Sequence, residues 1–299
     1  MNPQSILSRS TLEKSDAVII SAPYEKTASS RKGTQYGPKK IIDCLESKLE
    51  FFQRDYLAEA CAHVNISSLP ELALSKASPD EALKIVRNSC AMVLDKEKFP
   101  LLLGGEHSVT LGLLQALETK YDPHEVTILQ IDAHCDLRDS DADYSSSPSN
   151  LAHSCVMRRA HELGYNLVQV GIRTYSAAEY EYFSTHPESI SVFEWGLDKA
   201  PEIEEILAQV KTKYVYLTVD VDGFDPAYMP GTGTPVQGGL EWWYGVKLIK
   251  TLIKKFTLLG ADIVEVSPTP DSVLTEYGAS QLVYDILSYK FAEKIQKKL

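Results

Sequence analysis

Short apolar segments of strand length alternate with amphipathic segments of helix length along most of this chain. Apolar residues fill both faces of most strand-length segments, as in strands buried between two layers of helices. These segments lie at 17–20, 101–103, 126–131, 167–170, 214–219 and 263–266. Helices are predicted after Gly37-Pro38, after Ser78, and at 110–120, 201–211, 241–257 and 278–297. The alternation predicts an α/β fold, with a largely parallel sheet and helices on both faces.

The 299 residues contain no repeat, low-complexity tract or linker, so we expect a single domain over 1–299. The net charge of −11 argues against partners such as nucleic acid or an anionic membrane surface. It is compatible with metal ions and small cationic molecules. The five cysteines show no CxxC spacing, which argues against a disulfide framework and fits a reducing cytosol. We find no signal peptide and no apolar stretch of membrane-spanning length, so a cytoplasmic protein is expected.

The strongest chemical signal is the segment Asp132-Ala133-His134-Cys135-Asp136, which directly follows the apolar segment 126–131. In an extended chain alternate residues share one side, so the two aspartates and the histidine would project together. The alternative is a polar strand end with capping aspartates. Three metal-competent side chains at this spacing favour a metal site.

Further polar groups follow three other predicted strands. Asp220 and Asp222 end the segment 214–219, and two carboxylates so close together repel unless a cation or protons compensate them. Gly104-Gly105-Glu106-His107-Ser108 follows 101–103, and its glycines allow the backbone to approach the site closely. Glu265 lies near the end of the last segment, where a solvated edge acid is the alternative. In open α/β sheets ligands bind beyond the carboxyl ends of the strands.

Four aspartates and two histidines are enough ligands for two metal ions if Asp132 and Asp220 bridge them. Ligation dominated by oxygen favours Mn²⁺ over Zn²⁺. Two ions about 3.5–4 Å apart can activate water for attack on a cationic electrophile. A single-zinc, deacetylase-like enzyme is the disfavoured alternative, as is a metal-binding regulatory pseudoenzyme.

The motifs GGEHS, DAHCD, VDVDGFDPAYMPGTGTPVQGGL and EVSP together resemble the ureohydrolase family, which includes arginases and agmatinases. The resemblance covers essentially the whole chain. It implies a three-layer α/β/α fold with a mostly parallel eight-stranded sheet. It also implies a cluster of two Mn²⁺ ions that hydrolyses a guanidino group to urea and an amine. One ion would be held by His107, Asp132, Asp136 and Asp220, and the other by Asp132, His134, Asp220 and Asp222.

The resemblance also assigns the remaining roles. Glu265 would pair with the substrate guanidinium, Asp136 would steady the attacking nucleophile, and His153 would deliver a proton to the leaving amine. The stretches DAHCDLRD and HSCVMRR are similar to agmatinases, so agmatine is the predicted substrate. Guanidinobutyrate, formiminoglutamate, N1-substituted agmatines and arginine remain alternatives. Family habit implies a homo-oligomer, either a trimer or a hexamer.

Overall fold

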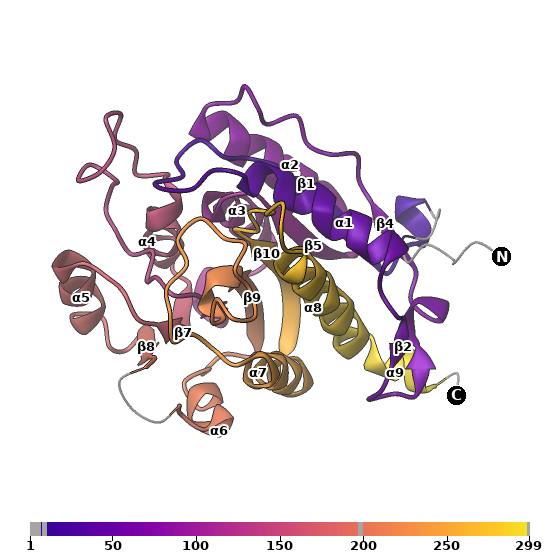
Figure 1. Ribbon diagram of the computed structural model, residues 1–299. Helices are drawn as coiled ribbons and strands as arrows, with labels where there is room; N and C mark the ends of the chain where they lie inside the picture. The colour runs from indigo at the N-terminus through magenta and orange to yellow at the C-terminus, as the bar shows by residue number, and fades with distance from the viewer. Residues whose placement is uncertain (1–6, 8–10, 197–199, 298–299) are drawn as a thin grey trace.

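The central element is one eight-stranded sheet in which every strand pairing is parallel (Figure 1). The computed structural model describes residues 7, 11–196 and 200–297. In spatial order the strands are β4 (Ile66–Ser68), β1 (Ala17–Ala22), β5 (Phe99–Gly104), β10 (Thr257–Val264), β9 (Tyr214–Asp220), β6 (Val126–Ile131), β7 (Asn166–Ile172) and β8 (Ile190–Glu194). The predicted fold class is therefore confirmed.

Two hydrophobic cores lie on opposite faces of this sheet, giving three layers (Figure 1). Alternate residues of β1 show the division, since Ile19 belongs to one core and Ile20 to the other. The first core is covered by α1 (Gly37–Ser47), α6 (Ile203–Leu207), α7 (Trp242–Lys255), α8 (Leu274–Lys290) and α9 (Ala292–Gln296). The second is covered by α2 (Pro79–Asp95), α3 (Thr110–Leu117) and α4 (Val156–Glu162), with α5 (Ala177–Ser184) packing at its margin.

Local capping chemistry sets where several helices begin. Ser78 caps α2 in a reciprocal capping box with Glu81, as the sequence predicts. Ser176 and Glu179 form a second capping box at the start of α5. Proline occupies the first turn of α1 and of α2, where its missing N–H costs no helical hydrogen bond.

Some boundaries differ from those predicted. The last strand starts at Thr257, six residues before the predicted segment, and ends just before Glu265. The helix predicted over 278–297 starts at Leu274 and is interrupted at Phe291. The sequence reading missed the edge strands β4 and β8, and the hairpin of β2 (Phe52–Gln53) and β3 (Ala58–Glu59), which are short or partly polar.

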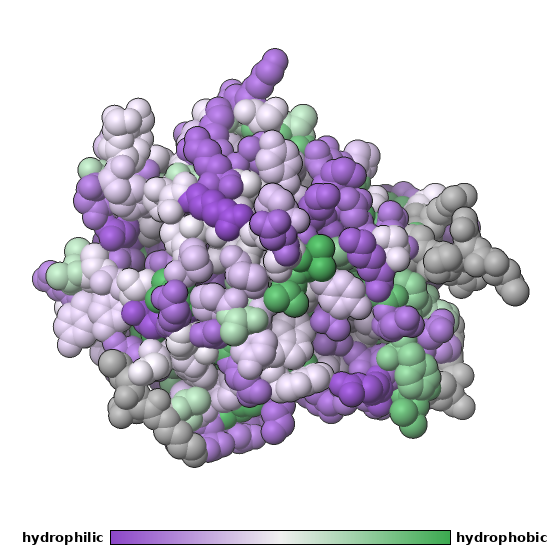
Figure 2. All heavy atoms as spheres, in the orientation of Figure 1, coloured by the Kyte–Doolittle hydropathy of each residue, from purple (hydrophilic) through white to green (hydrophobic). Residues whose placement is uncertain are grey.

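Most exposed residues are polar or charged. On the face shown in Figure 2, hydrophilic residues predominate and hydrophobic residues form small, separate patches. Among the residues that the structure describes, no helix combines the length and apolar composition needed to cross a bilayer.

Candidate metal centre

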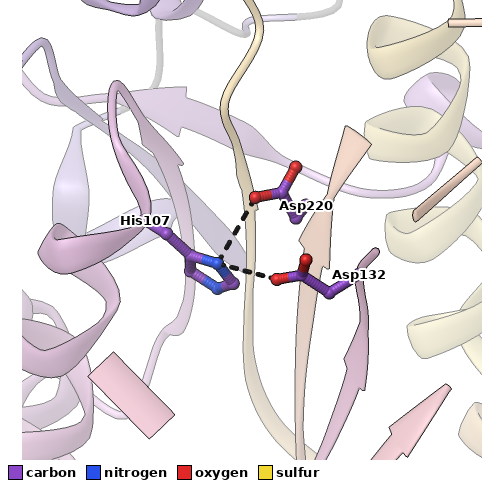
Figure 3. A group of neighbouring side chains, drawn as sticks. All are labelled: His107, Asp132 and Asp220. Carbon is purple, nitrogen blue, oxygen red and sulfur yellow. Dashed lines mark ion pairs between the residues drawn. The ribbon is translucent and has the colours of Figure 1, made fainter. Parts of the chain in front are cut away.

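The candidate site lies at the carboxyl edge of the sheet, where the neighbouring strands β5, β10, β9 and β6 end. His107 opens a short 3₁₀ turn after β5, Asp132 directly follows β6, and Asp220 is the last residue of β9. Figure 3 shows these three side chains meeting, with both carboxylates turned toward the imidazole. Parallel strands end at one edge, so residues far apart in the sequence converge there.

The imidazole of His107 is surrounded by carboxylates. Its Nδ1 lies 3.1 Å from Oδ2 of Asp132 and 3.1 Å from Oδ2 of Asp136. Oδ2 of Asp220 is 3.5 Å from the same nitrogen. All four side chains are buried, so solvent screens their charges only weakly.

The other ring nitrogen of His107 fixes the tautomer. Nε2 lies 2.9 Å from the hydroxyl of Thr218, and that hydroxyl donates its hydrogen to Oδ1 of Asp262 at 2.6 Å. Thr218 must therefore accept from the Nε2–H of His107, so the neutral imidazole has its lone pair on Nδ1, facing the carboxylates. A metal ion satisfies this arrangement, because lone pair and carboxylates are all ligands. Such an outer hydrogen-bond partner commonly orients a metal-binding histidine.

A second group of potential ligands forms around His134. Its Nδ1 is 3.1 Å from Oδ2 of Asp222 and 3.5 Å from Oδ1 of Asp132. Ligand atoms of His134, Asp132 and Asp222 lie within 4.8 Å of one another, and the same limit holds for His107, Asp132 and Asp220. Asp132 belongs to both groups, so the site can hold two cations with this carboxylate shared between them.

The pKa directions record the charge conflict that a cation would relieve. Burial, followed by the charges of Asp222 and Asp132, raises the pKa of Asp220 well above its ordinary value. Burial lowers the pKa of His107, but the surrounding aspartates outweigh it and raise that pKa well above normal. In the metal-free protein both groups therefore hold their protons to higher pH than usual.

Glu265 directly follows β10 and contacts the backbone of His107. Its Oε1 accepts a 2.8 Å hydrogen bond from the backbone N–H of His107. Burial, and then the nearby charge of Glu106, raises the pKa of the Glu265 carboxyl well above its ordinary value. A buried carboxylate with this raised proton affinity is suited to binding a cationic group.

Glu265 and Asp136 share an unusual backbone conformation. Their φ angles are 63° and 52°, in the left-handed region that non-glycine residues seldom adopt. Such strain persists where the surrounding structure enforces it, which is common at functional sites.

A cavity of about 300 Å³ leads from the exterior to these groups. His134, Asp136, Asp220 and Glu265 line this cavity. His153 lines the wall, where its ring nitrogen Nε2 is buried without a hydrogen-bond partner among the described residues. The ring of Tyr144 lies 6.3 Å from that of His153, measured between centroids, and lines the same cavity. All predicted site residues thus line this cavity or belong to the ligand groups next to it.

Comparison with known proteins identifies the family and the fold. The sequence profile of the arginase family matches residues 15–288. The chain belongs to the arginase family. It is 34% identical over 289 residues to an N(1)-aminopropylagmatine ureohydrolase of Synechocystis, covering 94% of this chain and 91% of that protein. It is 32% identical to an agmatinase of Bacillus subtilis, with 94% of each chain covered.

Solved structures agree with this assignment. The crystal structure of the agmatine ureohydrolase of Thermoplasma volcanium superposes with a TM-score of 0.85 at 30% identity. The match covers 100% of this chain and 96% of that one. This arginase-family chain is therefore an agmatinase-like ureohydrolase, a hydrolase acting on the C–N bonds of amidino groups. The family generally depends on a pair of metal ions, and the two ligand groups that share Asp132 fit such a pair.

The structure corrects the local geometry assumed for two motifs of this arginase-family site. Strand β6 ends at Ile131, and the left-handed backbone of Asp136 breaks the extended alternation predicted for the segment 132–136. Asp222 likewise lies in a 3₁₀ turn, where its N–H donates to Oδ1 of Asp220 at 2.9 Å. Both aspartates reach the site, but turns rather than strand periodicity direct them there.

Sequence reasoning missed several polar residues that support this arginase-family site. Asp262 is a fully buried carboxylate within the apolar strand β10, and Glu106 is a fully buried carboxylate beside His107. A charged residue inside an apolar segment is costly unless it has partners, and that cost was a usable signal for Asp262. No sequence signal connects Thr27 with the site, because the loop that carries it reaches the site only in the folded chain.

Proposed function

We propose that this chain hydrolyses agmatine to putrescine and urea with two Mn²⁺ ions. One observation carries the proposal: two ligand groups share Asp132, and members of both groups line one cavity together with Glu265. A cationic guanidinium suits this position because buried carboxylates dominate it.

The metal assignment follows the ligand groups. The first ion would be held by His107, Asp132, Asp136 and Asp220, and the second by Asp132, His134, Asp220 and Asp222. Carboxylate oxygens outnumber imidazole nitrogens, which supports Mn²⁺ over Zn²⁺. When bound, two such ions supply Lewis acidity and activate water at neutral pH.

The protein side chains carry the remaining steps. Glu265 pairs with the guanidinium and holds it in the cavity. Asp136 accepts a hydrogen bond from the attacking water and receives its proton. That proton passes through Asp136 and His153 to the departing nitrogen as its bond to carbon breaks. One water is consumed, and urea and a free amine are released.

The charges around the cavity support a cationic substrate tail. Arg138 lines the cavity, but its guanidinium is paired with Asp143 and lies 3.8 Å from Glu179. Its charge is therefore already balanced, so it gives a carboxylate tail such as that of guanidinobutyrate little advantage. The relatives named as acting on agmatine or N(1)-aminopropylagmatine support the same class of substrate.

A panel of guanidino compounds tests the proposal. Purified protein loaded with Mn²⁺ should release urea fastest from agmatine, compared with arginine, guanidinobutyrate and N1-aminopropylagmatine, and should release formamide from formiminoglutamate more slowly still. If another compound is hydrolysed fastest, that compound is the substrate and the proposed type of reaction still holds. No turnover of any compound would favour a regulatory pseudoenzyme, and one zinc per chain would favour the single-zinc alternative.

Three broader features complete the proposal. We expect one catalytic domain spanning 1–299, a cytoplasmic location and a homo-oligomer, either a trimer or a hexamer. The family resemblance supports the oligomer. Light scattering of the purified protein at several concentrations measures its state directly.

A further inference from the structure

Glu106 is a buried carboxylate that the proposed reaction leaves unused. It has no exposed surface, and neither ligand group includes it. Its Oε2 accepts hydrogen bonds from the backbone N–H groups of Lys26 and Thr27, each at 2.7 Å. Its Oε1 accepts from the hydroxyls of Thr27 and Ser108, also at 2.7 Å. Four donors thus converge on one charge, and three of them come from the loop after β1.

Thr27 links this carboxylate to His153. The Thr27 hydroxyl spends its single hydrogen on Glu106, so its oxygen is left as an acceptor. The backbone N–H of His153 donates to that oxygen at 3.0 Å. Residues 126 positions apart in the sequence are joined by this bond. The directions of both hydrogen bonds follow from the carboxylate, which can only accept.

The anchored loop is packed tightly against the glycine pair that precedes Glu106. A Cβ on Gly105 would lie 2.1 Å from the carbonyl oxygen of Tyr24, so only glycine permits this approach. The N–H of Glu106 donates to the same oxygen at 2.9 Å. Ser29 of this loop then lines the cavity beside His153. The loop therefore has little freedom to move relative to the strand ends.

The backbone carbonyl of His153 accepts from the N–H of Val156 in its 3₁₀ turn, but the imidazole itself has few polar contacts. Its ring nitrogen Nε2 has no hydrogen-bond partner among the described residues, and the ring lies next to Tyr144 without a bond. The place of the imidazole is therefore set largely by its backbone. A proton donor misplaced by about 1 Å can lose about a hundredfold in rate.

We propose that Glu106, acting through Thr27, is a positioning residue that holds His153 at the distance needed for proton delivery. This inference rests on the proposed function of the site. It assigns a task to the acidic residue of the GGEHS motif and to a loop from the start of the chain.

Substitution of Thr27 tests the link with a matched pair of variants. Thr27→Val keeps the shape and removes the hydroxyl, whereas Thr27→Ser keeps the hydroxyl. We expect Thr27→Val to lower kcat on agmatine about ten- to a hundredfold with KM changed less than about threefold. Thr27→Ser should stay within about threefold of the parent. Thr127→Val is the control, because Thr127 also bonds another hydroxyl but lies at the opposite end of β6, away from the site.

Substrates with different leaving amines distinguish a misplaced proton donor from a general loss of structure. An arylguanidine releases a weakly basic amine that needs less help from a proton donor. The defect of Thr27→Val should therefore be smaller with an arylguanidine than with agmatine. Equal losses of kcat with both substrates would overturn the inference. A Thr27→Val enzyme whose kcat on agmatine equals that of the parent would overturn it as well.

Hydrogen exchange tests the anchor without relying on activity. The amide of His153 should exchange faster in Thr27→Val and in Glu106→Gln than in the parent, and Thr27→Ser should retain its protection. Unchanged exchange in both disruptive variants would refute the positioning role. If no guanidino compound is hydrolysed, the proposed function fails, and this measurement still decides whether Glu106 and Thr27 hold His153.

Discussion

The backbone N–H of His107 donates a 2.8 Å hydrogen bond to the carboxylate of Glu265. One residue therefore presents its ring to the candidate metal ligands and its backbone to the group proposed to bind the guanidinium. The two halves of the site are held in register by this contact between the ends of β5 and β10. Displacing either strand end would alter both halves together.

The first prediction separates the charge of Glu265 from its hydrogen bond. In Glu265→Gln the amide oxygen can still accept from His107, but the negative charge is lost. We expect kcat/KM on agmatine to fall at least about a hundredfold, because a hydrogen bond to a charged partner is replaced by a neutral one in a buried site. Metal content, measured by plasma mass spectrometry, should equal that of the parent. Loss of metal together with activity would show that Glu265 instead supports the ligands.

The second prediction concerns the partner of His107 behind the ligands. Thr218→Val breaks the chain from Nε2 to Asp262, and loss of such a partner typically costs about 10–100-fold in metal affinity. Titration of metal-stripped protein with Mn²⁺ measures this cost. Thr127→Val in the neighbouring strand is the matched control and should bind Mn²⁺ normally. Equal affinities in the two variants would exclude the orienting role.

The third prediction follows from the raised pKa values of His107, His134 and Asp220. In the metal-free protein these groups keep their protons to higher pH than usual, so a cation must displace protons when it binds. Affinity for Mn²⁺ should therefore rise with pH and be weaker at pH 6 than at pH 8. Calorimetry in two buffers with different ionisation enthalpies should detect proton release. An affinity that is constant with pH would contradict this explanation.

The fourth prediction concerns Asp285 in α8, away from the site. Burial raises its pKa to about 6, although the amide of Gln53 donates to its carboxylate. A carboxyl whose pKa is higher in the folded than in the unfolded chain destabilises the fold as pH rises from about 4 to about 6. Asp285→Asn should therefore increase the free energy of unfolding at pH 8 by up to about 3 kcal/mol. At pH 4 the gain should disappear, which urea denaturation at both pH values would reveal.

The sequence predicts the main features of the fold because buried strands are short apolar segments with little ambiguity. His107, Asp132 and Asp220 meet as expected, since adjacent parallel strands end at one edge. The backbone turn that directs Asp136 into the site could not be predicted. Its left-handed φ of 52° depends on tertiary contacts rather than on the alternation of residues. The role of Thr27 was hidden for a similar reason. Its hydroxyl contacts Glu106 and His153, which belong to other segments of the chain, and no local sequence pattern indicates these contacts.

The order of the strands also determines when this site can come into existence during synthesis. β10 is the last strand to be made, yet it lies between β5 and β9. Until residues 257–264 leave the ribosome, the chain can build only two partial sheets, each with an open edge. Those edges can pair with other nascent chains, and chaperones bind intermediates of this kind. Assembly of the catalytic centre is therefore a late event, completed only when the final strand joins the two halves.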